Sequence, residues 1–182
     1  MRTQTVVSLC ALIVICFLVG TADGQPVYFA ATGHYYERVD EELTWEEAKV
    51  AAELCSYLGV SGHLVTITSQ AENDFLTDNL LLGLGNPCYC GGYQPPDSLE
   101  PDGGWTWVTG EPWEFANWAA GEPNDWANDE DCLEVKPDGS WNDAQISGTP
   151  RAYIVEYPVP EPATLSLALA ALGALGLLRK RD

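Results

Sequence analysis

The segment from Glu122 to Asp131 constrains the fold of this chain more than any other feature. Its ten residues include five carboxylates and no basic residue. Carboxylates held so close together repel one another, so the segment needs either full exposure to water or a cation. The wider window from Asp97 to Asp143 has the same bias, with 13 acidic residues and one basic residue. We therefore expect an irregular region that a cation organises, or else a solvated acidic loop.

The residue types in this window favour calcium. Ca²⁺ takes roughly six to eight oxygen ligands from carboxylates, amides and backbone carbonyls, and it tolerates irregular loops. Mg²⁺ demands a stricter octahedral geometry, and Zn²⁺ prefers His and Cys. Both histidines, His34 and His63, lie far from the window in sequence. Five tryptophans between Trp105 and Trp126 argue against a disordered segment.

The charge of the chain is unevenly distributed. The whole chain of 182 residues has a formal charge of −19. Residues 25–158 contain 24 acidic and 4 basic residues, a net of −20, whereas three basic residues gather at 179–181. A nucleic-acid partner is excluded, because such a protein needs a basic face to displace counterions. The hydrophobic fraction of 46% is too high for a disordered acidic chain.

Both ends of the chain have the pattern of targeting segments. Residues 1–24 begin with Arg2, continue with an apolar run and end in small residues, which is typical of a secretory signal peptide, with an uncleaved anchor helix as the alternative. Residues 159–182 contain an apolar stretch of 16 residues, followed by the basic cluster. Such a helix would be about 24 Å long, so it could span a membrane with help from snorkelling flanks. The basic cluster should stay cytoplasmic, which leaves the acidic domain outside.

Between these ends, residues 25–158 are expected to form one α+β domain. Residues 27–39 should form one or two strands. Thr44 and Ser69 are expected to cap two helices, with Glu47 and Glu72 at the capping-box positions. Further short strands are expected at 64–67, 90–94, 105–109, 132–136 and 151–157. The irregular stretch 95–131 is long enough to suggest a functional role.

An ordered set of motifs gives this domain a resemblance to the C-type lectin domain. The motifs are Glu122-Pro123-Asn124, Glu130-Asp131-Cys132 and Trp141-Asn142-Asp143, together with residues 104–110, 117–118 and 44–45. The resemblance covers nearly all of residues 25–157. It implies a C-type lectin-like fold, with two helices, short antiparallel sheets and a long calcium-organised loop region.

The resemblance also implies a set of site residues. One Ca²⁺ would be held by Glu122, Asn124, Glu130, Asn142 and Asp143, with Pro123 in the cis form. The first four would also bind sugar, the Glu carboxylates as acceptors and the Asn amides as donors. The order of the motif implies mannose-, glucose-, N-acetylglucosamine- or fucose-type ligands. A second Ca²⁺ would use Asp102, Asp125 and Asp131, but Ser98 stands at an expected ligand position and leaves this second ion open.

The C-terminal segment resembles a PEP-CTERM sorting signal, through Pro160-Glu161-Pro162, the short apolar stretch and the basic end. This resemblance implies export, processing by an exosortase-type membrane enzyme and an exopolysaccharide or biofilm context, with a plain membrane anchor as the alternative. The chain should then be a carbohydrate-binding protein of the cell surface or matrix, transiently anchored by its C-terminal helix. The alternative is a protein-binding or structural module in which calcium only stabilises the loop.

An enzyme is not expected. No serine has a Gly-x-Ser-x-Gly context, and carboxylates that bind Ca²⁺ stay ionised and unfit as general acids. Trp113 and Trp126 are candidates to stack on a sugar ring, although most tryptophans should lie in the core. Four cysteines remain after removal of the signal peptide, namely Cys55, Cys88, Cys90 and Cys132. They allow three disulfide connectivities or free thiols, and only a Cys88–Cys90 bridge is disfavoured by strain.

Overall fold

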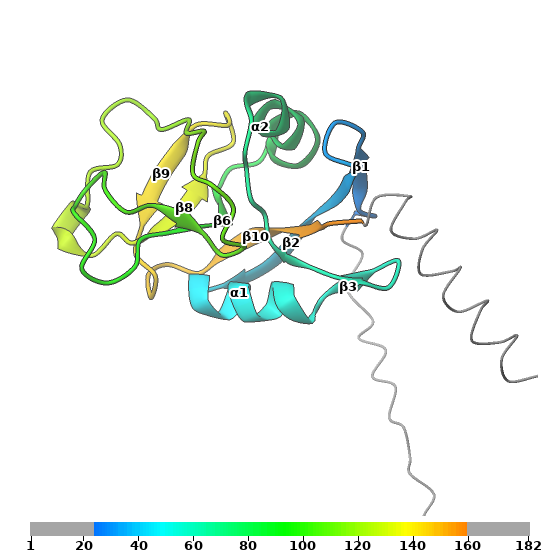
Figure 1. Ribbon diagram of the computed structural model, residues 1–182, viewed down its shortest axis with the longest axis horizontal. Helices are drawn as coiled ribbons and strands as arrows, with labels where there is room; N and C mark the ends of the chain where they lie inside the picture. Colours follow the sequence, from blue (N-terminus) through cyan, green and yellow to red (C-terminus); the bar gives the residue numbers. More distant parts are fainter. Residues whose placement is uncertain (1–23, 160–182) are drawn as a thin grey trace, which may run out of the picture.

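The computed structural model describes residues 24–159. The elements in chain order are β1 (Val27–Phe29), β2 (His34–Leu43), α1 (Trp45–Leu54), β3 (Ser56–Tyr57), β4 (Val60–Ser61), β5 (His63–Leu64), α2 (Gln70–Leu76), the π-helical turn η1 (Thr77–Leu81), β6 (Cys88–Tyr93), β7 (Thr106–Trp107), the 3₁₀ turn η2 (Trp126–Asn128), β8 (Cys132–Val135), β9 (Trp141–Ala144) and β10 (Arg151–Tyr157). Figure 1 shows α1 on one side of the sheet and α2 on the other.

The main sheet has eight strands. Its central path runs β1-β2-β10-β6-β8-β9, with β5 paired to β10 and β7 paired to β6, while β3 and β4 form a separate hairpin. The pairings are antiparallel except for the parallel contact of β10 with β6 at Tyr153 and Tyr89. The predicted α+β class with two helices is confirmed, and most of the short strands join one mixed sheet.

Strand β10 divides the interior into two cores, because successive side chains of a strand point to opposite faces. Tyr153, Val155 and Tyr157 pack with α1, whereas Ala152 and Ile154 pack on the side of α2. The first core also contains Trp45, Ala48 and Ala52 of α1, and the second contains Leu76 and Leu81. Figure 1 shows β10 and β2 running between the two helices.

The two helices begin at the predicted caps. At α1, the Thr44 side chain and the Glu47 carboxylate form a complete capping box, as expected. At α2, the Ser69 hydroxyl accepts the Glu72 amide N–H at 3.2 Å. The Glu72 carboxylate does not return to Ser69 but is buried, where it accepts the backbone N–H of Thr68 at 2.8 Å. Tertiary packing has therefore replaced the second half of this capping box.

Several strands differ from the prediction. The expected strand 64–67 is shortened to β5, and its remainder continues as buried irregular chain that still pairs locally, with Val65 N–H donating to Ile154 O at 3.0 Å. Strand β9 and the β3–β4 hairpin were not predicted. Among the described residues, Cys55, Cys88, Cys90 and Cys132 are all free thiols.

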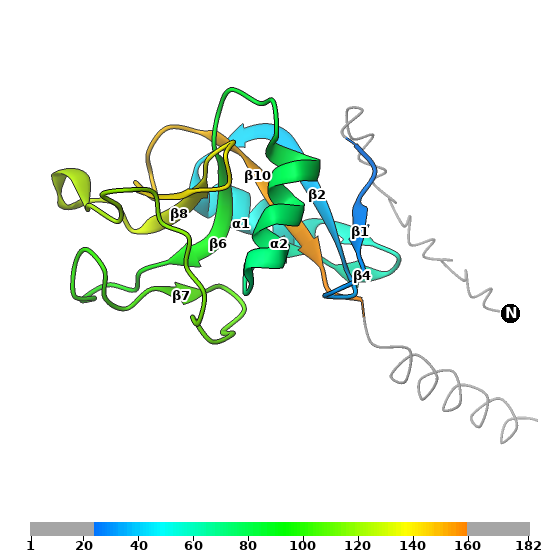
Figure 2. The same cartoon turned by 90° about the horizontal axis from the view of Figure 1, so that it is seen from above.

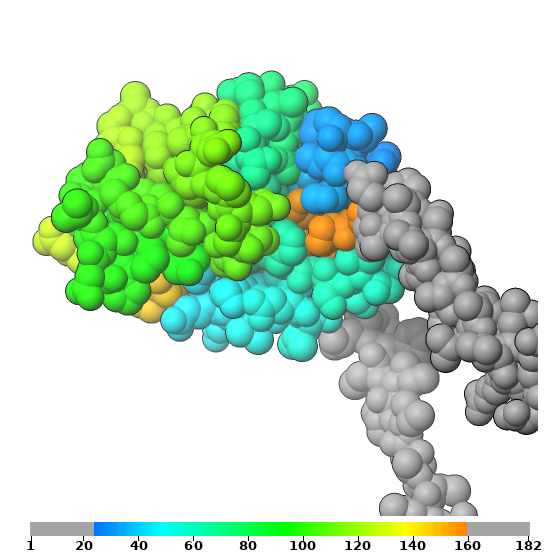
Figure 3. All heavy atoms as spheres, viewed as in Figure 1, coloured from blue at the N-terminus to red at the C-terminus, as the bar shows by residue number. Residues whose placement is uncertain are grey.

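The two ends of the described chain lie at one end of the domain, and the loop around η2 lies at the opposite end (Figures 1 and 2). Figure 3 shows the loop-rich half, in green to yellow-green, forming that far end of the surface. The predicted signal peptide and the sorting tail fall outside the described residues, apart from Gly24 and Val159 at their edges. Within residues 24–159, no helix is long and apolar enough to cross a membrane.

Candidate functional site

The five predicted calcium ligands come from one loop and one strand. Glu122, Asn124 and Glu130 lie in the loop before β8, and Asn142 and Asp143 lie on β9. The β8–β9 ladder pairs Leu133 with Asp143, so the end of the loop is fixed beside β9. The start of the loop is fixed as well, because Ala119 N–H donates to Trp141 O at 2.9 Å.

Asp143 is the centre of this arrangement. Its side chain is 0% exposed, and its Oδ2 accepts the backbone N–H groups of Asn124 at 2.8 Å and Asp125 at 2.7 Å. Its Oδ1 is also buried, yet it has no hydrogen-bond partner among the described residues. The Glu122–Pro123 peptide bond preceding these two amides is cis, as the motif implied.

Glu122 and Asn124 contact each other at the surface of the loop. The side-chain amide of Asn124 donates to Glu122 Oε2. Lys136 lies nearby, with its Nζ 3.8 Å from Glu122 Oε1. Because the amide nitrogen of Asn124 is turned to Glu122, its carbonyl oxygen remains the atom that can act as a ligand.

Glu130 holds the tip of the loop. Its Oε2 accepts the Trp126 N–H at 2.9 Å, and its own N–H donates to Asp125 Oδ1 at 3.3 Å. Burial raises the pKa of Glu130, and the charges of Asp143 and Glu122 raise it further. These three carboxylates therefore share one electrostatic environment, although Asp143 comes from β9 and the other two come from the loop.

The loop tip has a strained backbone. Asp125, Ala127 and Asn128 all have positive φ, at 47°, 65° and 53°. Such conformations cost roughly 1–3 kcal/mol each for residues with a Cβ, and they persist only where the surroundings enforce them. Here the hydrogen bonds to Asp143 and Glu130 provide that enforcement.

The region proposed for a second ion contains Asp125 and Asp131, with Asp102 exposed in the neighbouring loop. Glu100 and Gln94 belong to the same region, although no sequence motif predicted them. Loss of hydration raises the pKa of Glu100, and the charges of Asp125 and Asp131 add to this rise. Gln94 is buried, donates to Gly103 O at 2.7 Å and leaves its Oε1 without a partner among the described residues. No local sequence pattern marked these two residues, because the fold of the loop decides their position.

Most of the tryptophans pack in the interior of the domain rather than in the loop around η2. Trp105, Trp107, Trp113, Trp118 and Trp141 form one aromatic cluster. Trp113 stacks on Trp107 with ring centroids 4.4 Å apart, so it belongs to the core. Trp126 is different, because it is 68% exposed and lies between Asn124 and Glu130. Of the two predicted stacking residues, Trp126 is the more exposed, whereas Trp113 is partly buried against the core.

A second carboxylate cluster lies away from this loop. Glu156 and Glu72 are both buried, and His34 Nδ1 lies 2.5 Å from Glu156 Oε1. The Tyr36 hydroxyl donates to Glu72 Oε1 at 2.7 Å. His63 Nδ1 approaches the same Glu156 carboxylate at 3.9 Å. His34 therefore pairs with this buried acid, whereas His63 Nδ1 lies closer to the backbone oxygen of Leu64, at 2.9 Å.

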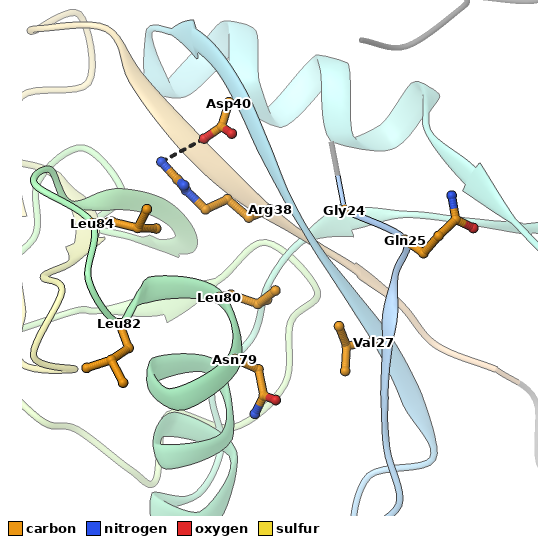
Figure 4. Close-up of a pocket in the computed structure, with 9 residues that line it drawn as sticks. All are labelled: Gly24, Gln25, Val27, Arg38, Asp40, Asn79, Leu80, Leu82 and Leu84. Atoms are coloured by element: carbon orange, nitrogen blue, oxygen red, sulfur yellow. Dashed lines mark ion pairs between the residues drawn. The ribbon is translucent and has the colours of Figure 1, made fainter. Parts of the chain in front are cut away.

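The described residues hold no group of three or more His, Cys, Asp or Glu side chains that is already arranged as a metal cluster. The predicted set includes two asparagines, and its glutamates are turned to Asn124, Lys136 and Trp126. The best-defined cavity, of about 280 Å³, lies elsewhere, between the start of the domain, β2 and the η1 region. Figure 4 shows Leu80 and Val27 on its walls and the Arg38–Asp40 ion pair at its edge, with none of the predicted ligands.

Comparison with known families gives two matches. Residues 41–154 match the Lectin C-type domain, and residues 158–181 match the PEP-CTERM protein-sorting motif. Among curated proteins, halomucin of Haloquadratum walsbyi is 33% identical over 164 residues, which covers 79% of this chain but 2% of halomucin. Lectin BRA-3 of Megabalanus rosa is 28% identical over 150 residues, covering 79% of this chain and 86% of that lectin.

Solved structures agree with this match. The C-type carbohydrate-recognition domain of cow CD23, determined in the presence of a GlcNAc2Man3 oligosaccharide, has a TM-score of 0.61 and 27% identity, covering 78% of this chain and 99% of that one. The mouse scavenger receptor C-type lectin domain also has a TM-score of 0.61, with 26% identity, covering 76% of this chain and 97% of that one. Both structures are of carbohydrate-recognition domains.

Proposed function

This chain belongs to the C-type lectin domain family, and on that premise we propose that it is an exported, surface-associated protein that binds carbohydrate through Ca²⁺. The family implies carbohydrate binding, and the similar proteins are lectins and receptors rather than enzymes. Beyond carbohydrate binding, we propose the calcium dependence, the sugar class and the location.

One observation carries the calcium part of the proposal, and it is the orphaned oxygen of Asp143. Burying a carboxylate oxygen without a hydrogen-bond partner costs at least about 1–3 kcal/mol of folding free energy. Oδ2 already accepts two backbone N–H groups, so Oδ1 is the atom that still needs a positive partner. Oxygen ligands from carboxylates and amides are the donor set that Ca²⁺ prefers. The residues present therefore fit the ion.

The other four residues would complete the donor set around Asp143. Glu122 and Glu130 offer carboxylate oxygens, and Asn124 and Asn142 offer amide oxygens. A bound Ca²⁺ would supply the coordination positions that two vicinal sugar hydroxyls complete. Carboxylates of the same set accept hydrogen bonds from those hydroxyls. We propose sugars with equatorial 3- and 4-hydroxyls, of the mannose, glucose, N-acetylglucosamine or fucose type.

The exposed ring of Trp126 would form one wall of this sugar site. It lies on the same loop as Asn124 and Glu130, and its backbone N–H is fixed by the Glu130 carboxylate. An aromatic face can contact the apolar face of a pyranose ring. A single shallow site of this kind binds weakly, so useful affinity would come from many copies on one surface.

The location follows from the C-terminal motif. The match to the PEP-CTERM motif over residues 158–181 supports export, surface association and processing by an exosortase-type enzyme. The described chain leaves the domain at the end opposite to η2 (Figure 1). A domain attached through this tail would present its sugar site outward, which suits binding to exopolysaccharide or cell-surface glycan.

The test is calorimetric titration of purified full-length protein with mannose, N-acetylglucosamine and galactose, with and without Ca²⁺. We expect binding of mannose-type sugars only when Ca²⁺ is present. Absence of Ca²⁺-dependent binding to any member of a saccharide array would refute the proposal.

The alternative function is a protein-binding or structural module in which Ca²⁺ only stabilises the loop. One relative, by its name a low affinity immunoglobulin epsilon Fc receptor of mouse, shows that such domains occur in receptors for a protein. The double substitution Glu122→Gln with Asn124→Asp separates the two functions. In a lectin it should change the sugar preference, whereas a protein-binding module should keep its partner.

A further inference from the structure

An ion pair between a buried carboxylate and a partly exposed arginine lies behind the candidate site; the Arg151 side chain is 26% exposed. Glu134 on β8 and Arg151 at the start of β10 interact with the Arg151 Nε 2.5 Å from Glu134 Oε2. The Glu134 residue is 4% exposed. Neither residue is a predicted ligand, and nothing in the local sequence links them, because 16 residues separate them.

The second oxygen of Glu134 faces a predicted ligand. Glu134 and Asn142 are direct partners in the β8–β9 ladder. Asn142 Nδ2 donates to Glu134 Oε1 at 3.2 Å and also to the backbone oxygen of Asp143. Both of these partners are acceptors, and an asparagine amide nitrogen has two hydrogens to donate. The chemistry of the neighbours therefore fixes the nitrogen on this side and leaves Oδ1 as the free atom of the carboxamide.

A stabilising role explains this pair poorly. Taking the Glu134 carboxylate out of water costs several kcal/mol, and its attraction to the partly exposed Arg151 only offsets this cost. A geometric role explains it better, since a charged acceptor held by a guanidinium imposes one orientation on its neighbour. We propose that Glu134, fixed by Arg151, is a positioning residue that orients Asn142 so that Oδ1 serves the cation.

The inference rests on the proposed calcium site and adds to it the residue that prepares one of its ligands. Asn142 binds with its oxygen because its nitrogen is occupied by Glu134. Glu134 accepts one amide hydrogen of Asn142 and the backbone oxygen of Asp143 accepts the other, so neither is available to a sugar. Asn124 donates one amide hydrogen to Glu122 and keeps the second, so it becomes the main amide donor toward sugar.

Glu134→Gln tests this directly. Arg151 has only donors to offer, so the new Gln side chain must turn its oxygen to Arg151 and its NH₂ group to Asn142. Two amide nitrogens would then face each other, and Asn142 must rotate to present its oxygen to residue 134. This rotation removes Oδ1 from the cation. The change in shape is minimal, so the substitution alters the orientation of Asn142 far more than its packing.

We expect Ca²⁺ affinity of the full-length protein to fall about 10–100-fold in Glu134→Gln, the usual effect of losing a residue that orients a ligand. The matched control is Glu72→Gln, which changes another buried carboxylate away from the loop and should leave Ca²⁺ affinity within about twofold. The assay is calorimetric titration with CaCl₂ alone. A Glu134→Gln protein with wild-type Ca²⁺ affinity overturns the proposal.

A second variant covers the case in which Glu134→Gln does not fold. The double substitution Glu134→Leu with Arg151→Leu removes the charges and the acceptor together, and it should fold because apolar replacement of a buried charge together with its partner is tolerated. Its thermal stability without Ca²⁺ should match the wild type, while its Ca²⁺ affinity should fall. Unchanged Ca²⁺ affinity in this variant also overturns the proposal.

A measurement without Ca²⁺ separates this inference from the proposed function. In the Ca²⁺-free wild type, NMR should show slow hydrogen exchange for the side-chain amide of Asn142 and fast exchange for exposed Asn128. If Ca²⁺ binding is absent but the Asn142 amide is protected and loses this protection in Glu134→Gln, the proposed function fails and the positioning role stands. If the wild-type Asn142 amide exchanges as fast as that of Asn128, the positioning role is wrong.

Discussion

The buried cluster between α2 and β10 makes a quantitative prediction for Tyr36→Phe. Tyr36 is 0% exposed, and its hydroxyl donates to Glu72 Oε1 at 2.7 Å, while Glu156 Oε1 lies 3.5 Å away. Glu72 is itself buried, with its other oxygen held by Thr68. Phenylalanine fills the same space but removes the donor. The substitution therefore removes the hydrogen bond to the buried Glu72 carboxylate, together with the contact of the hydroxyl with Thr32 Oγ1 at 2.9 Å.

The expected loss follows from this geometry. A hydrogen bond to a charged group contributes about 1.5–3 kcal/mol, so we expect a loss of about 2 kcal/mol in the free energy of unfolding. Unfolding of the 136 described residues should have an entropy of about 0.29 kcal/mol/K. The Tm should then fall by about 7 °C. Tyr28→Phe is the matched control, since Tyr28 is 51% exposed and should change stability by less than about 0.5 kcal/mol.

The pH dependence makes this prediction specific to Glu72. Burial raises the pKa of Glu72, so its carboxyl begins to protonate above the ordinary value of 4.5. The loss from Tyr36→Phe should be largest near pH 7.5, where Glu72 is charged, and should shrink at lower pH as the neutral acid forms. The assay is urea unfolding of both variants near pH 7.5 and at a lower pH at which the neutral acid of Glu72 forms. The reasoning is wrong if Tyr36→Phe equals Tyr28→Phe at neutral pH, or if its effect grows on acidification.

Three further predictions concern His34, the candidate ion and Trp126. The hydrogen bond to Glu156 raises the pKa of His34, so protonated His34 contributes its full stabilisation below pH 6.5 and loses it as the pH rises through the raised pKa. Urea unfolding of Ca²⁺-free protein should therefore show a free energy of unfolding that falls over that pH range. His34→Gln should flatten this profile. Removing Ca²⁺ with EDTA should lower the Tm, because an ion present at about a hundredfold excess over its Kd adds about 2.7 kcal/mol to the free energy of unfolding. An unchanged midpoint in calorimetry would contradict the calcium site. Trp126→Ala should weaken sugar binding several-fold in titrations while Ca²⁺ affinity stays the same, and equal sugar affinity would exclude the stacking role.

Local signals in the sequence predicted the elements that local interactions determine. Thr44 and Glu47 form the expected capping box because both partners belong to the same turn. Ser69 and Glu72 have the same spacing, but the Glu72 carboxylate bonds to Tyr36 and Thr68 instead. A carboxylate that can be buried with a distant donor leaves its local partner, and no spacing rule contains that information.

The same distinction explains what was found and missed at the site. Strand β9 contains polar Asn142 and Asp143, so its pattern does not predict a strand; pairing with β8 makes it one. The motif around Glu122 was recognisable because its residues lie close together in sequence. Glu134, Arg151 and Glu100 were missed because their roles depend on register and loop path. Family resemblance therefore led to the proposed ligands, and the fold revealed the residues that contact them.

The charge balance of the domain favours an external cation at Asp143. The four basic side chains of residues 25–158 all contact carboxylates, in the pairs Arg38–Asp40, Lys49–Glu53, Lys136–Glu122 and Arg151–Glu134. Glu156 has His34 as its internal counter-charge. Asp143 receives two backbone N–H groups, and among the described residues its Oδ1 has no partner. The lysine and arginine side chains in this range are thus already paired with other acids, which supports the proposal that a cation from solution, Ca²⁺ by its preference for oxygen ligands, binds at Asp143.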